Sequence, residues 1–425
     1  MRRLVFICVL GACGNDPDPR LIAGGGVGDG PIDGTLNVFA IDNATKQPIA
    51  SASVAVGDHE GTTDATGLVI VKDVEGPQTI AIKAAGYRST VWADVDGANV
   101  TIPVTALETT PDQATLSGSI TNWSAVTVPT GHVKAAFVVY SQSDSLGDPA
   151  NEIQTPNNGN VCGFAGGATC DWTVASRTGS VSLAAAIIDL DPKGTADETD
   201  DTMTIIGWAI RSGIVVEDGV NQSGLALEQV EAGNLQNVTV DLGTPPASLT
   251  TTAALVGIEV GSDEVVQLPV FLATDKTTAL VPEPEVFGAG ATYRLTAIAQ
   301  TASGDQGAQS IVLRQGQTAT ALAAGEWLVP PTGFTASRTE ATFDPVEGAL
   351  LGQVSWSDAT QNILEITLFD PVRTAVVPAL VALPASGTLT ARAAGIGADL
   401  DPQDFSLDVD KRKLFGIAAQ PTPVP

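Results

Sequence analysis

Apolar and polar residues alternate with a period of two along much of this chain. Leu36, Val38 and Ala40 fall on one face of a predicted strand, and Ile80 and Ile82 fall on one face of another. Successive strand residues point to opposite sides of a sheet, so this period predicts strands with one buried face. Gly, Pro, Asp and Asn bound these short runs, as is typical of turns between strands. The pattern therefore predicts an all-β protein.

Other apolar runs are continuous. Residues 68–71 are all apolar, which predicts a strand buried on both faces. Further runs rich in β-branched and small apolar residues predict strands at residues 114–121, 133–141, 180–190, 203–210 and 235–242. Few stretches repeat with the 3.6-residue period of a helix.

The length of the chain indicates several domains. Its 425 residues exceed the roughly 250–300 residues at which a single hydrophobic core stops growing. Breaks rich in Pro, Gly and Thr stand at residues 109–112, 243–248 and 329–333. We therefore predict tandem small β-sandwiches at residues 34–108, 109–243, 244–330 and 331–425. The opening of the last one, PPTGFTASRTEATF, is similar to the entry of fibronectin type III-like domains, with Trp356 as its candidate core tryptophan.

The N-terminus carries a different pattern. The basic MRR precedes LVFICVL, an apolar run far shorter than the about 20 residues that span a bilayer, which fits a secretory signal. Leu10-Gly11-Ala12-Cys13 then resembles the lipobox of bacterial lipoproteins. The resemblance implies cleavage of a signal peptide at residues 1–12 and attachment of diacylglycerol to Cys13. The alternative is an ordinary signal peptide with an incidental cysteine.

Such an anchor predicts a place in the bacterial cell envelope, on the periplasmic or outer-surface side. The membrane would then be a partner through the lipid on Cys13. Residues 14–33 hold six Gly, three Pro and four Asp and little to bury. This composition predicts that residues 13–33 form the lipidated cysteine and a flexible tether, with a reach of roughly 25 Å.

The segment at residues 34–108 resembles the carboxypeptidase regulatory-like domain, a prealbumin-like sandwich of seven strands. The matching motifs are Gly34-Thr35, Pro48-Ile49, Gly61-Thr62-Thr63-Asp64 with Gly67, Gly76, and Ala85-Gly86-Tyr87-Arg88. The sequence departs from the family at Ser51-Ala52, where Gly-Ala is usual, and at Leu68, near where Phe is more common. The resemblance covers about a sixth of the chain and implies an accessory module without catalytic residues.

The charge of the chain restricts its partners. The formal net charge is -28, and removing Arg2 and Arg3 with the signal would make it -30. Nucleic acid is excluded as a partner, because binding phosphates requires a basic face. Adhesion of the protein surface to anionic lipid head groups is disfavoured for the same reason. The hydrophobic share of 44% is nevertheless enough for packed cores.

Two cysteines enclose a glycine-rich stretch. Cys162 and Cys170 flank GFAGGAT, and an exported chain favours a disulfide between them. The bond would contribute roughly 2–3 kcal/mol by restricting the unfolded chain. A metal site lacks histidine partners nearby, and a redox-active pair would be expected as CxxC.

Two acidic loops are the candidate metal sites. The first, Asp189 to Asp201, places carboxylates at EF-hand-like spacing, and calcium prefers such clustered oxygen ligands. Its candidate ligands are Asp189, Asp191, Asp197, Asp200 and Asp201. The alternative is a solvated acidic hairpin, because Lys193 replaces one ligand and strands flank the loop. In the second loop, Asp399 to Asp410, the alternation of Phe405, Leu407 and Val409 predicts a strand with outward Asp residues.

Little in the sequence points to catalysis. The two histidines, His59 and His132, fall in different predicted sandwiches, and His59 is expected at the surface of a hairpin. No nucleophile, zinc-peptidase or nucleotide-binding motif is present in the sequence. The scattered tryptophans are expected in cores or rims: Trp92, Trp123, Trp172, Trp208, Trp327 and Trp356.

The sequence therefore predicts a non-catalytic, lipid-anchored envelope protein that acts as a structural or binding module, with no cofactor required. The alternative is a calcium-assisted surface protein that binds carbohydrate or peptide, with an envelope glycan or protein as its ligand. An unrecognised hydrolase is the third and least favoured class.

Overall fold

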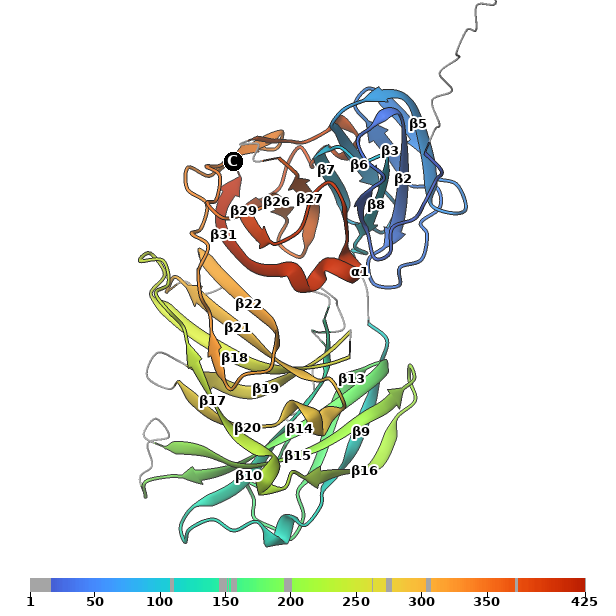
Figure 1. Ribbon diagram of the computed structural model, residues 1–425. Coiled ribbons are helices and arrows are strands. Elements are labelled where there is room, and N and C mark those ends of the chain that lie inside the picture. The colour runs from blue at the N-terminus through green and yellow to red at the C-terminus, as the bar shows by residue number, and fades with distance from the viewer. Residues whose placement is uncertain are drawn as a thin grey trace, which may run out of the picture.

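The computed structural model describes residues 17–107, 111–144, 151, 153, 159–194, 201–261, 263–272, 277–302, 307–370 and 374–424. Strands dominate these residues, and the longest helix assigned among them is a single turn. The predicted all-β class and the tandem β-sandwiches are confirmed (Figure 1).

The first sandwich packs two sheets around one core. One sheet contains β2 (Asp33–Asp42), β5 (Leu68–Glu75) and β8 (Asn99–Val104), and the other contains β3 (Ser53–Val56), β4 (His59–Thr62), β6 (Gln78–Lys83) and β7 (Ser89–Val95). Leu36, Val38, Ile80 and Ile82 all lie in the core between them, as their alternation predicted.

The continuous run at the start of β5 is not buried on both faces. Val71 lies in the core, but the side chain of Ile70 on the opposite face is 46% exposed. The prediction of a fully buried strand is therefore wrong at this position. The reason is that β5 forms an edge of its sheet, and no second layer covers the outer face at Ile70.

Residues 17–25 do not form the expected tether; they are a strap along the outer face of the first sandwich. The side-chain amide of Asn37 donates to the carbonyl of Pro17 (3.1 Å), and the amide of Asn99 donates to that of Asp18 (3.3 Å). The backbone N–H of Ile22 donates to the hydroxyl of Thr101 (2.9 Å). Asn37, Asn99 and Thr101 are outward-facing polar residues, yet they are buried because the strap covers them.

The strap continues into β1 (Gly26–Gly28), which pairs with β8 on one side and with β30 (Phe405–Ser406) on the other. The glycines serve this close packing. Gly26 has φ 154°, and a Cβ atom there would lie 2.0 Å from the carbonyl oxygen of Phe405. A Cβ on Gly24 would lie 2.2 Å from a carboxylate oxygen of Asp408. The glycine run thus permits contact with the C-terminal part of the chain, whereas its composition predicts flexibility.

The second sandwich folds one sheet over on itself. Its strands are β9 (Gln113–Ile120), β10 (Val133–Tyr140), β12 (Val161–Cys162), β13 (Asp171–Arg177), β14 (Gly179–Asp191), β15 (Thr202–Val216) and β16 (Gln222–Gln229). Leu183 and Ile187 of β14 point into this core, whereas Ala184 and Ala186 point into the next one. A strand buried on both faces explains the unbroken apolar run at residues 183–188.

The third sandwich includes a strand that the sequence boundaries assign to the second. Its larger sheet contains β18 (Thr251–Val260), β19 (Glu264–Leu272), β21 (Thr292–Gln300) and β22 (Gln309–Gln317). The facing sheet contains β17 (Leu235–Asp241), β20 (Thr278–Pro282) and β23 (Ala321–Ala323). Val238 and Val240 of β17 lie in the third core, so the chain enters this sandwich before the expected boundary at residue 243.

The fourth sandwich pairs with the first and with the third. It contains β24 (Thr335–Ala336), β25 (Glu340–Thr342), β26 (Leu351–Ser357), β27 (Asn362–Leu368), β28 (Thr374–Val376), β29 (Leu389–Ala398) and β31 (Leu414–Val424). Strand β27 runs parallel to β7, and β31 pairs with β22. One sheet of 13 strands therefore crosses the boundaries between sandwiches.

Neighbouring sandwiches also share the two faces of single strands. Ile80 and Ile82 of β6 lie in the first core, and Ala81 between them lies in the fourth. Trp356 is fully buried in the fourth core, and its indole N–H donates to the carbonyl of Ser337 (3.0 Å). The other tryptophans are buried or, for Trp327, partly buried, which confirms their prediction as core or rim residues. No described helix has the length and hydropathy needed to cross a bilayer.

Candidate functional site

The first acidic loop lies at one end of the second sandwich, beside a histidine that the sequence did not connect with it. Val133 of β10 pairs with Leu190 of β14, so His132 comes next to the two aspartates that flank Leu190. His132 Nδ1 lies 2.8 Å from Asp189 Oδ1, and His132 Nε2 lies 3.7 Å from Asp191 Oδ1. Pairing the predicted strands at residues 133–141 and 180–190 as antiparallel neighbours would have found this contact.

The carboxylates of this loop are already engaged. Asp191 Oδ2 lies 2.5 Å from Lys193 Nζ, and the hydrogen bond from Lys193 holds the pKa of Asp191 below its usual value. Of the five candidate calcium ligands, Asp197 and Asp200 lie outside the described residues, and Asp201 is partly buried. Within the described part of the chain, His, Cys, Asp and Glu side chains form no group of three that could hold a metal.

The disulfide predicted between Cys162 and Cys170 is present, with the two Cα atoms 5.1 Å apart. It closes the stapled loop, residues 163–169, which begins against the start of β10, the strand that His132 precedes. Phe164 in this loop is 46% exposed, and its ring meets that of Phe137 edge to face at 6.2 Å. The disulfide therefore presents an aromatic side chain at the same end of the sandwich as the acidic loop.

The lysine beside this loop adds a partly buried positive charge. Lys134 Nζ donates to the carbonyls of Trp123 and Val126, each at 2.7 Å, and lies 4.5 Å from the centre of the Trp123 ring. Burial lowers the pKa of Lys134. These bonds fix the short 3-10 turn Trp123–Ala125 on the second sandwich.

The second acidic loop is a structural connection. Residues 399–413, the tie, leave β29, contact three sandwiches and return as β31. Gln403 accepts a hydrogen bond from the backbone N–H of Asp96 (2.8 Å), and Leu407 N–H donates to the carbonyl of Gly25 (2.8 Å). The predicted strand is correct only for Phe405–Ser406, because residues Leu407–Asp410 form the helical turn α1. Val409 consequently points into solvent.

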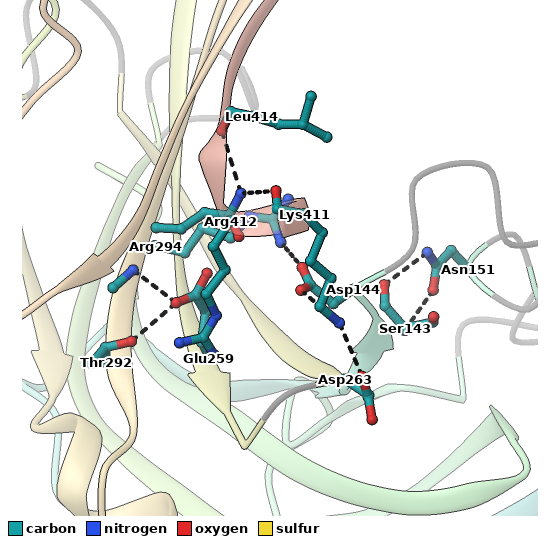
Figure 2. Close-up of polar contacts among 12 residues, drawn as sticks. Ser143, Asp144, Asn151, Glu259, Asp263, Thr292, Arg294, Lys411, Arg412 and Leu414 are labelled. Atoms are coloured by element: carbon teal, nitrogen blue, oxygen red, sulfur yellow. Dashed lines mark hydrogen bonds and ion pairs between the residues drawn. The ribbon is translucent and has the colours of Figure 1, made fainter. Parts of the chain in front are cut away.

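The tie ends at a cluster of charges between three sandwiches, shown in Figure 2. Asp144 follows β11 (Gln142–Ser143), a short strand that pairs with β19. The carboxylate of Asp144 binds the guanidinium of Arg294 on β21 and lies 3.4 Å from Lys411 Nζ in the tie. Lys411 Nζ also lies 2.9 Å from Asp263. We call these four residues the joint.

The buried side chains of the joint leave little room for a ligand role. The side chains of Asp144 and Arg294 are only 7% and 9% exposed, and they pair with each other. Beside them, Glu259 accepts hydrogen bonds from the hydroxyl of Thr292 (3.0 Å) and the backbone N–H of Gly316 (2.8 Å) (Figure 2). A buried ion pair with a matched partner fixes orientation, because separating its two charges is costly. The joint therefore holds the second, third and fourth sandwiches in one arrangement.

A hollow of about 340 Å³ lies between the strap and the tie. Ile22, Val27 and Phe405 form its apolar floor, and Arg20 and Asp410 stand at its polar rim. Asp410 binds Lys413 Nζ at 2.9 Å, which holds the pKa of Asp410 below its usual value. The rim charges are thus engaged within the protein: Arg20 likewise binds Asp29 at 2.6 Å.

The two histidines lie in different sandwiches. His59 is exposed at the start of β4, as expected, whereas His132 faces the aspartates of the first acidic loop. Cys13, the candidate lipidation site, lies outside the described residues.

No family model matches this chain, and no curated protein matches it. Solved structures similar to it include the Bacillus anthracis TIE protein, with 11% identity, 64% of this chain and 45% of that chain covered, and a TM-score of 0.16. The major pilin subunit of Bacillus cereus shows 12% identity over 65% of this chain and 89% of that one, with a TM-score of 0.16. A streptococcal ancillary pilin shows 11% identity over 63% and 89%, with a TM-score of 0.12. Likenesses this weak carry no argument about what the chain does.

Proposed function

We propose that this chain is a non-catalytic, lipid-anchored protein of the bacterial cell envelope that acts as a rigid structural and binding module. The observation that carries the proposal is the sharing of strands between successive cores, reinforced by the tie and the joint. Independent sandwiches on linkers would move freely, whereas shared strands hold each sandwich against the next. This architecture suits a protein that holds one end at a fixed place relative to the other.

The anchor of this proposal is Cys13, and the N-terminal sandwich, which resembles the carboxypeptidase regulatory-like family, is the accessory module nearest to it. Replacing Cys13 by Ser should release the protein from the membrane fraction and remove the lipid mass from the mature N-terminus. Cys8→Ser is the matched control, because Cys8 precedes the expected cleavage site. Membrane fractionation and mass that are unchanged by Cys13→Ser would refute the anchor.

Recognition of a carbohydrate or peptide is the second candidate function, and the stapled loop favours it. The disulfide fixes Phe164 in an exposed position, which reduces the ordering that a ligand would have to impose. Binding of the protein to a glycan array or to peptidoglycan peptides should fall when Phe164 is changed to Ala. Met203→Ala, which removes another exposed apolar side chain of the second sandwich, should leave binding unchanged.

Turnover of an ester, glycoside or peptide would refute the non-catalytic assignment.

A further inference from the structure

The strap changes how far an anchored protein can stand from the membrane. Cys13 lies only four residues before Pro17, and Pro17 is already bonded to Asn37 on β2. An extended chain spans at most about 3.6 Å per residue, so Cys13 can lie no more than about 14 Å from Pro17. The reach of roughly 25 Å expected from a 20-residue tether is therefore lost.

The surface that this short link holds near the lipid is the outer face of the first sandwich. Asn37 pairs directly with Ile70 of β5, and paired Cα atoms on antiparallel strands are about 4.5–5.5 Å apart. With the Pro17–Asn37 hydrogen bond and its side chain included, Cys13 is thus confined to within roughly 30 Å of Ile70. Ile70 is a large apolar side chain that is 46% exposed on this face, and such a side chain is more stable at a lipid interface than in water.

We propose that the bilayer surface itself is the partner of this face, so that the protein lies with β5 and the start of the strap against the head groups. The inference rests on the proposed lipid at Cys13. The lower part of the molecule in Figure 1, with β10, β15 and β16, then points away from the membrane. The stapled loop and the first acidic loop are displayed at this distal part.

The surface that contacts the outer face of the first sandwich is that of a neutral lipid bilayer. The formal charge of -28 disfavours a strongly anionic one, and the apolar contact at Ile70 needs no lipid charge. The covalent lipid supplies the affinity, and the short link supplies the orientation. A longer link would keep the affinity for the membrane and remove the fixed orientation.

The test uses the full-length lipidated protein in phosphatidylcholine vesicles that carry an acceptor dye on a small fraction of head groups. A donor dye is attached at Ile70→Cys in one sample and at Met203→Cys, an exposed position on β15 beside the first acidic loop, in another. We expect strong energy transfer from position 70 and several-fold weaker transfer from position 203. Inserting 20 Gly and Ser residues between Asp16 and Pro17 should remove most of the transfer from position 70 while membrane binding persists.

Two results would overturn the inference while the proposed anchoring stands. They are equal transfer from the two positions in vesicle-bound protein, and transfer from position 70 that the insertion does not change. If Cys13→Ser remains bound to the vesicles like the wild type, the anchor itself is refuted and the inference falls with it.

Discussion

The two acidic loops of this protein have similar compositions and different roles. Asp189 to Asp201 lies at the free end of one sandwich, where His132 contacts Asp189 and Lys193 pairs with Asp191. Asp399 to Asp410 is part of the tie, which binds three sandwiches through backbone and side-chain hydrogen bonds. The difference teaches that a cluster of aspartates acquires its role from the neighbours that the fold supplies.

The largest loss of stability is expected from a substitution where the tie meets the joint. Asp144→Ala leaves the buried guanidinium of Arg294 without its partner and also removes a contact of Lys411. Breaking a buried pair from one side costs about 3–5 kcal/mol. Urea denaturation should therefore show a much lower midpoint, and small-angle scattering should show a less compact molecule.

The matched control for Asp144→Ala is Asp191→Ala in the first acidic loop. Its partner Lys193 is 44% exposed, and ion pairs open to solvent contribute little to stability. If the two substitutions lowered the urea midpoint equally, the distinction between the loops would be wrong.

The next largest loss of stability is expected at β1, the strand that joins the strap to the tie. Gly26→Ala would place a methyl group 2.0 Å from the carbonyl oxygen of Phe405, which must separate β1 from β30. Overpacking of this kind destabilises by about 1–3 kcal/mol. Gly28→Ala is the control, because its Cβ would meet atoms only at ordinary contact distances of 3.4 Å or more. Equal melting temperatures for the two variants would contradict the close packing of the glycine run.

A smaller effect should appear as a pH dependence of the tie. The pKa of Asp410 is lowered by the hydrogen bond from Lys413 and by that from the backbone of Ser406. A lowered pKa stabilises the fold above the unfolded value of about 3.9, and this stabilisation is lost as the pH falls through the folded pKa. Asp410→Asn should therefore lower the free energy of unfolding at pH 7 by about 1 kcal/mol or less, seen as a lower melting temperature, and have a vanishing effect near pH 2. A difference that persisted at pH 2 would show that the substitution acts through packing.

The smallest expected effect is that of calcium. Lys193 and His132 already occupy carboxylate oxygens of the first loop, and those of the tie face Lys413 and backbone donors. We expect millimolar calcium to leave the melting temperature unchanged and titration calorimetry to show no binding heat. A calcium-dependent shift abolished by Asp189→Asn would restore the first loop as a metal site.

The sequence by itself determined the class of fold. The period of two at Leu36, Val38 and Ala40 reflects strand geometry, which is local, and so the strands could be located without the structure. The pairing of Cys162 with Cys170 also followed from their proximity in the chain and an exported setting. Both depend on residues close together in sequence.

Only the tertiary structure decided what lies against what. The glycine run at residues 24–26 has the composition of a flexible linker, and nothing local shows that Phe405, almost 380 residues later, packs against it. No local pattern predicts the contact between Asp144 and Lys411. Nor does one predict that the second face of β14 packs into the core of the third sandwich. Contacts between distant segments depend on how whole sandwiches pack, and that packing is the sum of many weak contacts with no signal in any short stretch of sequence.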